Sequence, residues 1–209
     1  MDDHTWSALA SKTAPGQHLA LLYRDEAFLA RGVAAWAAGS LVPGGAAILV
    51  GTPIHAELIR NELRRSGFDV PRLEREGRLL VVDADWLMAQ FILDGKPTAA
   101  SFDELVRGMI TRVRDVAGLV PIRAWGEMVS LLRVRNDPAA AQKLESMWNA
   151  AIDEHGIALL CSYSSADDGP HGWQKLVDDV TSVHTHIVPE SGLGFENRIL
   201  EASAAPMFQ

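Results

Sequence analysis

The sequence is poor in cysteine and lysine. Cys161 is the only cysteine among 209 residues, so no disulfide can form within the chain, and a reducing compartment is expected. Lysine occurs only four times, and acidic residues outnumber basic ones 27 to 19, which gives a formal charge of -8. A surface of this charge repels a phosphate backbone, so direct binding to DNA or RNA is disfavoured.

Long apolar runs are also lacking. No run approaches the roughly 20 residues that a membrane-spanning helix needs, and the acidic first residues contain no apolar core of a signal peptide. We therefore expect a cytoplasmic protein that is not attached to a membrane. Apolar residues make up 48% and charged residues 22%, which is typical of a globular protein. The length predicts one domain over 1–209, with a patterned core at about 16–189 and short extensions at both ends.

Five short, nearly continuous apolar runs predict strands that are covered on both faces. They are His18–Tyr23, Ala46–Gly51, Leu79–Asp83, Ile122–Gly126 and Ile157–Tyr163. Helical patterns lie between them, and capping residues predict where four of these helices begin. The predicted starts are Asp25, Thr52-Pro53, a capping box of Ser101 with Glu104, and Asp137-Pro138. The alternation predicts an α/β fold of three layers, a mostly parallel sheet with helices on both faces.

The sequence lacks the phosphate-binding loop GxxxxGK[ST] that nucleotide-binding α/β proteins carry after their first strand. The first predicted strand, HLALLY, runs directly into RDEAFLARGV without a glycine or lysine in the turn. Asp25 and Glu26 stand where a polyphosphate would lie, and their charge would repel it. The only Gly-Lys pair, at 95–96, fails the motif because Gln90 replaces its first glycine and Pro97 follows the lysine. We therefore expect no ATP hydrolysis.

The segment 44–84, GGAAILVGTPIHAELIRNELRRSGFDVPRLEREGRLLVVDA, nevertheless resembles the part of RecA/KaiC-type ATPases that follows the phosphate loop. The resemblance implies catalytic carboxylates at the end of the strand that opens this segment. Gly51 and Thr52 stand there instead, so the base that would activate water is missing.

Four further motifs resemble the MEDS domain, the sensory module named for methanogens, methylotrophs and the regulator DcmR. They are HLALLY at 18–23, RAWGEM at 123–128, LESMWN at 144–149 and HTHIVP at 184–189. The resemblance covers about 16–189. It implies a KaiC-like fold without a working phosphate loop, used as an input domain for a histidine kinase, an anti-sigma factor or a transcription regulator.

Three candidate ligand-binding residues stand at predicted strand ends, where ligands of parallel sheets bind. Tyr23 and Arg24 end the first strand, and Arg24 would offer a bidentate donor to an anionic or carbonyl group. Glu127 follows the fourth strand, where the resemblance to RecA-like ATPases implies a magnesium-binding acid. Each has a structural alternative: Tyr23 as a packing residue, and Glu127 as an acid favoured by a helix dipole.

The remaining candidates come from other segments. His18 begins the first strand, and Tyr163 ends the fifth. Glu145 and Trp148 share a helix edge, where Glu145 is either a solvated charge or a ligand contact, and Trp148 is either core or an aromatic wall of the site.

His184 and His186 form an H-x-H pair, which on a strand would direct both rings to one face. They would contact a ligand, serve a structural role, or hold zinc together with Cys161, Glu127 or His18. Cys161 itself lies within an apolar run and is expected to be a buried, inert thiol.

These features predict a binding module in which a small molecule enters the crevice at the strand ends and shifts a conformational equilibrium. The domain would pass its state to a regulatory protein, and we expect no catalytic residues and no cofactor. Two alternatives stay open: a divergent nucleotide-binding enzyme or kinase-like protein that uses Glu127, and a metal-dependent hydrolase that uses His184 and His186. The oligomeric state is also open: Trp6, Met207 and Phe208 near the ends would either form the interface of a homodimer or belong to disordered ends.

Overall fold

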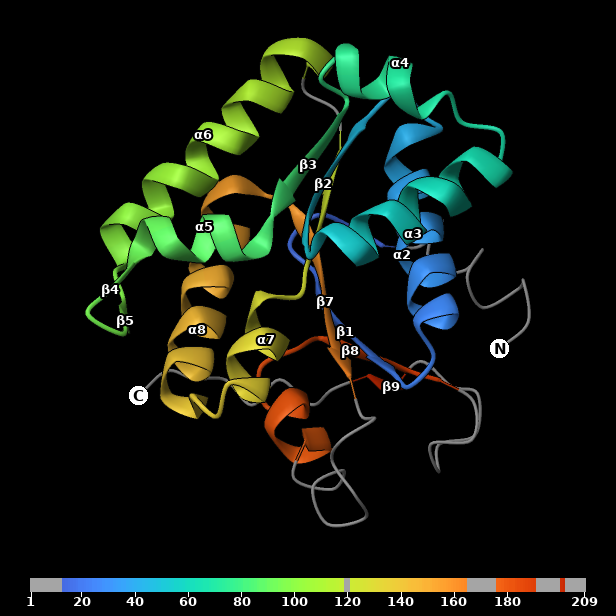
Figure 1. The fold of residues 1–209 in the computed structure, drawn as a ribbon. Helices are drawn as coiled ribbons and strands as arrows, with labels where there is room; N and C mark the ends of the chain where they lie inside the picture. Colours follow the sequence, from blue (N-terminus) through green and yellow to red (C-terminus); the bar gives the residue numbers. More distant parts are fainter. Residues whose placement is uncertain (1–12, 119–120, 165–175, 191–199, 202–209) are drawn as a thin grey trace.

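The computed structural model describes residues 13–118, 121–164, 176–190 and 200–201. Within these residues seven strands form one sheet in the order β3-β2-β6-β7-β1-β8-β9 (Figure 1). The strands are β1 (His18–Tyr23), β2 (Ala46–Gly51), β3 (Leu79–Asp83), β6 (Ile122–Gly126), β7 (Ala158–Ser164), β8 (His186–Pro189) and β9 (Leu200–Glu201). All neighbours pair in parallel except β8 and β9, which confirms the mostly parallel sheet.

Helices cover both faces of the sheet, which confirms the three layers (Figure 1). One face packs against α2 (Glu26–Leu41), α3 (Pro53–Arg65) and α4 (Val70–Arg75). The other packs against α5 (Ala84–Phe91), α6 (Ala99–Ala117), α7 (Met128–Val134) and α8 (Pro138–His155). A two-stranded hairpin of β4 (Ile92–Leu93) and β5 (Lys96–Pro97) connects α5 with α6.

Three of the four predicted helix caps are confirmed. The carboxylates of Asp25 and Asp137 accept hydrogen bonds from the N–H groups of Ala27 and Ala140 in the first turns of α2 and α8. The hydroxyl of Thr52 accepts from the His55 N–H in the first turn of α3. The capping box of Ser101 with Glu104 is wrong. α6 begins at Ala99, after Thr98, so both residues lie inside the helix.

The predicted strands agree with the structure except that the fifth begins and ends one residue later than expected, at Ala158 and Ser164. Strands β8 and β9 and the hairpin were not expected from the sequence. β8 is short and contains only the apolar pair Ile187 and Val188 with Pro189, too little to distinguish it from a loop.

Alternation along β1 sends its side chains to opposite faces of the sheet. Tyr23 packs with the α2–α3 layer, whereas His18, five positions earlier, faces α8. Two residues that were expected to share one site are therefore separated by the sheet.

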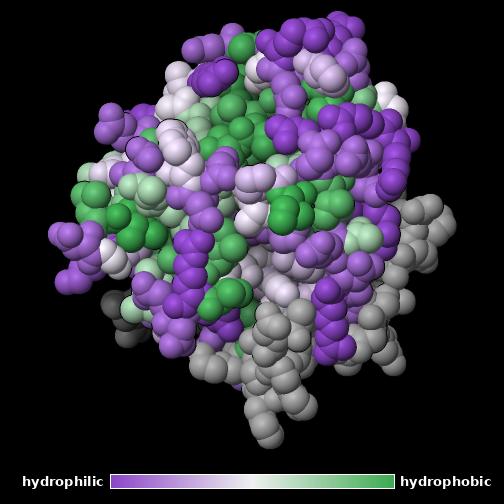
Figure 2. All heavy atoms as spheres, in the orientation of Figure 1, coloured by the Kyte–Doolittle hydropathy of each residue, from purple (hydrophilic) through white to green (hydrophobic). Residues whose placement is uncertain are grey.

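An open groove runs along the edge strand β3 and is bordered by α5 and α6. Its apolar members include Leu80, Val82, Leu105 and Met109. Figure 2 shows hydrophobic side chains gathered on this face over β3. Among the described residues no helix is both long and apolar enough to cross a bilayer. Trp6, Met207 and Phe208, the expected interface residues, lie outside the described ranges.

Candidate functional site

The predicted site residues form two separate groups. One group lies at the carboxyl edge of the sheet near α3 and contains Tyr23 and Glu127. The other lies beneath α8 and contains His18, Glu145, Tyr163 and His184.

In the first group, Glu127 is buried and fully engaged by its neighbours. It follows β6 directly and precedes α7. One carboxylate oxygen accepts a hydrogen bond from the Thr52 N–H, and the other lies 2.5 Å from His55 Nδ1 on α3. The Tyr23 ring meets the His55 ring edge-on, with centroids 6.2 Å apart. Glu127 therefore anchors the first turn of α3 to the end of β6.

Charge and burial compete in setting the pKa of His55. Burial alone would lower this pKa, but the hydrogen bond to Glu127 and the charges of Glu127 and Glu26 raise it above its ordinary value. Burial and the same two carboxylates raise the pKa of Tyr23, which keeps its phenol protonated.

The turn after β1 is occupied by a carboxylate from the protein itself. The backbone N–H groups of Arg24 and Asp25 donate to Glu190 Oε2 at 2.6 and 3.1 Å. In a phosphate-binding loop, such amides would cradle an anion from outside. The Arg24 side chain is exposed, and the carboxylate of Asp25 caps α2.

Gly51 ends β2 where the resemblance to RecA/KaiC-type ATPases implies a catalytic carboxylate, and the space beside it is filled. A Cβ atom at this position would overlap the indole ring of Trp125 and lie 3.0 Å from Glu127 Oε1. Trp125 is held by a 3.1 Å hydrogen bond from its indole N–H to Ser162 Oγ. Thus no side chain fits at residue 51 without displacement of the indole.

The second group is a buried polar cluster between the sheet and α8. His18 and Cys161 come from the neighbouring strands β1 and β7, and Glu145 comes from α8. His18 Nε2 lies 3.3 Å from Cys161 Sγ and 3.6 Å from Glu145 Oε2. His184 is fully buried in the turn before β8, and its Nε2 lies 3.8 Å from Glu145 Oε1. The Tyr163 hydroxyl donates to Glu145 Oε1 and approaches His184 Nε2 at 3.4 Å.

Burial controls the protonation of this cluster, because a charge is costly away from water. It lowers the pKa of His18 to about 4, against the opposing hydrogen bonds to Asn149 and Val183, and it lowers that of His184 as well. It raises the pKa of Glu145 to about 7, although the Tyr163 hydroxyl and Arg133 oppose the shift. Burial also raises the pKa of the Cys161 thiol.

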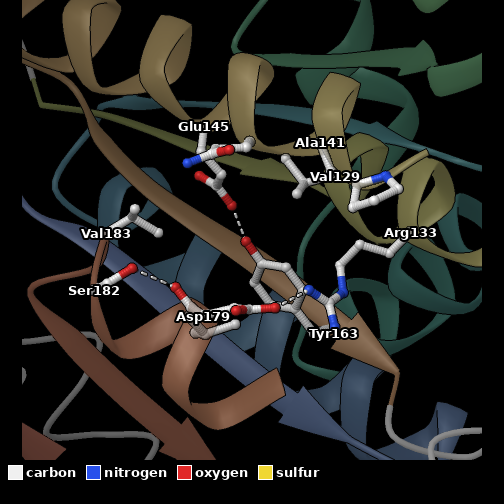
Figure 3. A pocket seen from close by; sticks show the side chains of 11 residues that line it. Val129, Arg133, Ala141, Glu145, Tyr163, Asp179, Ser182 and Val183 are labelled. Atoms are coloured by element: carbon white, nitrogen blue, oxygen red, sulfur yellow. Dashed lines mark hydrogen bonds and ion pairs between the residues drawn. The ribbon is translucent and has the colours of Figure 1, made fainter. Parts of the chain in front are cut away.

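A cavity of about 210 Å³ adjoins this cluster. Its walls are formed by α7, α8, Tyr163 of β7 and the segment 179–183. This segment contains the last residues of a short helix, 176–181, and the turn that follows it. In Figure 3 the Tyr163 hydroxyl points at Glu145, and Arg133 of α7 reaches toward Asp179. The Arg133–Asp179 ion pair is 3.0 Å long, and Val129 and Ala141 supply apolar wall. The cavity therefore combines an apolar lining with two polar pairs.

Burial and packing test the alternatives stated for Glu145 and Trp148 of α8. Glu145 is 5% exposed, so the solvated alternative is wrong. Trp148 packs edge-on against Phe102 of α6, with ring centroids 4.9 Å apart, and does not belong to the lining of the cavity.

His184 and His186 do not form a pair on one strand face, because β8 begins only at His186. His186 Nδ1 lies 3.1 Å from the Thr185 hydroxyl, and His186 is absent from the buried cluster. A metal site built on these two histidines, as the hydrolase alternative requires, is therefore not formed by the described residues.

Sequence reasoning missed several residues that complete the two groups. Asn149 follows Glu145 by one helical turn, so its approach to His18 could have been read from the i, i+4 spacing. His55, Arg133, Asp179 and Glu190 gave no local signal. Their roles depend on which loops meet in space, which periodicity does not report.

Comparisons with known proteins agree with this architecture. The crystal structure of a KaiC-like protein from the hyperthermophilic archaeon Pyrococcus horikoshii OT3 superposes with a TM-score of 0.58 at 13% identity, covering 90% of this chain and 80% of that one. At this identity the likeness establishes the fold alone. No curated protein sequence matches the chain. The family profile described as the methanogen/methylotroph, DcmR sensory domain (MEDS) matches residues 17–185. The chain therefore belongs to the MEDS family of sensory domains and has a KaiC-like α/β fold.

Proposed function

We propose that this chain senses a small organic molecule, which binds in the cavity between α7, α8, β7 and residues 179–183. The observation that carries the proposal is the cavity itself, with the Glu145–Tyr163 pair on its wall. This position differs from the crevice first expected around Tyr23 and Glu127, where the protein's own side chains take the available hydrogen bonds.

The size of the cavity favours a small ligand. Pockets for drug-sized molecules have volumes of about 300–1,000 Å³. A volume of about 210 Å³ corresponds to roughly seven water molecules at ~30 Å³ each. A compound of that many non-hydrogen atoms fits, with an apolar body against Val129 and Ala141 and one polar group.

The polar group of the ligand would be recognised by the Glu145 carboxyl group and the Tyr163 hydroxyl. Both are buried, so an unpaired donor or acceptor there costs more than it would in water. A ligand with a hydroxyl, amine or carboxyl group would meet this requirement, whereas a purely apolar ligand would not.

Ligand binding would change the relation between separate segments of the chain. The cavity walls belong to α7, α8 and residues 179–183, and the Arg133–Asp179 ion pair links the first of these to the last. A ligand that fits only when these walls are closed would favour that state by its difference in affinity for the two states. A regulatory protein such as a histidine kinase, an anti-sigma factor or a transcription regulator would bind one of the two states in preference to the other.

We further propose that the domain does not hydrolyse ATP. The amides of the β1–α2 turn already bind Glu190, and the indole of Trp125 excludes a side chain at residue 51. Calorimetric titration of the purified protein with ATP and Mg²⁺ is expected to give no binding heat. Tight binding, or phosphate release that Glu127→Gln abolishes, would contradict the proposal.

A thermal-shift screen tests ligand binding directly. Short-chain alcohols, amines and carboxylic acids are screened beside hydrocarbons of equal size, since a ligand specific to the folded state raises its Tm. The same screen is run on Ala141→Leu, which fills the cavity, and on Ala139→Leu, which adds the same atoms at an exposed position of α8.

We expect at least one polar compound to raise the Tm of the wild type and of Ala139→Leu but not that of Ala141→Leu. Equal responses from all three proteins would place the ligand elsewhere. The absence of any response from the folded wild type would contradict the proposed ligand class.

A further inference from the structure

The buried cluster beneath α8 brings together four side chains of metal-binding type. His18, Glu145, Cys161 and His184 each offer one ligand atom, and these atoms all lie within 4.8 Å of one another. We propose that they form a binding site for a divalent transition metal ion of the zinc type. The ligand atoms would be Nε2 of both histidines, Cys161 Sγ and Glu145 Oε2.

The separations around His18 Nε2 agree with tetrahedral coordination. Zinc bonds of about 2.0–2.3 Å to nitrogen, oxygen and sulfur place neighbouring ligand atoms roughly 3.4–3.6 Å apart. His18 Nε2 lies 3.3 Å from the sulfur and 3.6 Å from Glu145 Oε2. His184 Nε2 lies 3.8 Å from Glu145 Oε1, the oxygen that accepts from Tyr163, and all four ligand atoms lie within 4.8 Å of one another. The cluster thus needs little rearrangement to surround one ion.

Both imidazole rings are held in the form that binds a metal through Nε2. His184 Nδ1 lies 2.8 Å from the Val180 carbonyl oxygen, which can only accept, so Nδ1 carries the proton and Nε2 presents its lone pair to the cluster. His18 Nδ1 lies 2.8 Å from the Asn149 side-chain oxygen, with the same result. Metal-binding histidines usually have such partners on the second nitrogen.

An unpartnered oxygen points independently to a missing ligand. Glu145 Oε2 is buried and makes no hydrogen bond within the part of the chain that the structure describes. Buried polar atoms without a partner are rare, because burial without compensation is costly. Glu145 Oε1 already accepts from Tyr163, so Oε2 is the oxygen left for coordination.

The donor set selects the class of metal. Two imidazoles, one thiolate and one carboxylate suit zinc and its close neighbours and do not suit magnesium or calcium, which prefer oxygen ligands. The two negative ligands would balance the charge of a divalent ion, so the buried site would be neutral when filled. With four protein ligands the site would be structural, and it would tie β1, β7, α8 and the turn before β8 together.

This inference goes beyond the proposed ligand cavity and does not depend on it. A metal at this position would lie between Glu145 and the side chains of His18 and Cys161. The organic ligand would lie in the cavity that Glu145 and Tyr163 share with Arg133, which neither His18 nor Cys161 lines. Either site could be occupied without the other.

Titration with Co²⁺ as a probe tests the site in the full chain under reducing conditions. Cys161 is the only cysteine, so a thiolate-to-cobalt charge-transfer band can arise only from this residue. We expect such a band with visible bands of tetrahedral strength, saturation at one ion per chain, loss of the bands when Zn²⁺ is added, and a higher Tm with either metal.

His18→Gln and His184→Gln are expected to abolish the charge-transfer band or weaken Co²⁺ binding at least tenfold. The matched control is His186→Gln, which changes a nearby histidine outside the cluster and should leave the band and the stoichiometry unchanged. If the two variants fail to fold, the wild-type spectrum still decides. Absence of the band in folded, reduced wild type at excess Co²⁺ would overturn the proposal, as would a band that both variants form with the Co²⁺ affinity of the wild type.

Discussion

Two buried glutamates, Glu127 and Glu145, have opposite relations to their surroundings. Each carboxylate oxygen of Glu127 has a partner within the protein, the Thr52 N–H or the His55 ring, so these contacts connect the end of β6 to α3. Glu145 has one oxygen bound to Tyr163 and another without a hydrogen-bond partner among the described residues. Both residues were candidates from the sequence, and only their contacts in the structure distinguish them.

Gly51 and Gly108 give a matched test of the packing around the carboxyl edge. Gly51→Ala should lower the free energy of unfolding by about 1–3 kcal/mol, because the new methyl group overlaps the Trp125 indole. Gly108→Ala, on an exposed position of α6 with open space, should raise it by about 0.5–1 kcal/mol. Urea unfolding of both variants measures the difference. If Gly51→Ala were as stable as Gly108→Ala, the indole would not occupy the place that we assign to it.

His55 should make stability depend on pH. Its folded-state pKa is raised by Glu127 and Glu26, so the protonated ring stabilises the native state. This contribution is full below the unfolded-state pKa of about 6.5 and is lost as pH rises through the higher folded-state value. Urea unfolding should therefore show a larger loss in His55→Gln at pH ~5.5 than at pH ~8.5. A loss that grows with rising pH would contradict the assigned ion pair.

At the scale of elements, continuous apolar runs were sufficient to predict the five adjacent strands β3, β2, β6, β7 and β1. β8 was missed because its pairing with β1 depends on residues distant in sequence, while its own four residues carry a weak pattern. The separation of His18 from Tyr23 could have been predicted from the sequence. The two residues are five positions apart on one strand, an odd number, so their side chains must face opposite sides of the sheet. The cavity could not be predicted from the sequence, because it forms only where α7, α8 and residues 179–183 come together in the folded protein.

The cap of α8 carries a prediction at the same scale. Asp137 accepts from the Ala140 N–H and starts the helix that positions Glu145 and Asn149. Asp137→Ala should cost about 0.5–2 kcal/mol of unfolding free energy. Ser101→Ala, at the position wrongly expected to cap α6, should change it by less than about 0.5 kcal/mol. If chemical denaturation gave equal losses of unfolding free energy for the two variants, the Asp137 cap would not stabilise α8 as we expect.

For the molecule as a whole, a KaiC-like sheet is retained while the turn after its first strand binds the protein's own Glu190. The fold and the family were both predictable, since they depend on patterns distributed over the whole chain. The location of the proposed site was not predictable, because both oxygens of Glu127 have partners within the protein, whereas Glu145 Oε2 under α8 has no hydrogen-bond partner among the described residues. Membership of a sensory family and a small cavity beside those groups motivate the proposed ligand binding.

Hydrogen–deuterium exchange with the strongest compound from the thermal-shift screen tests this proposal most directly. We predict slower exchange in α7, in the first half of α8 and in residues 176–183 of the wild type, and no change in Ala141→Leu. Protection confined to the first turn of α3 and the amides around Glu127, with α7 and α8 unaffected, would contradict it.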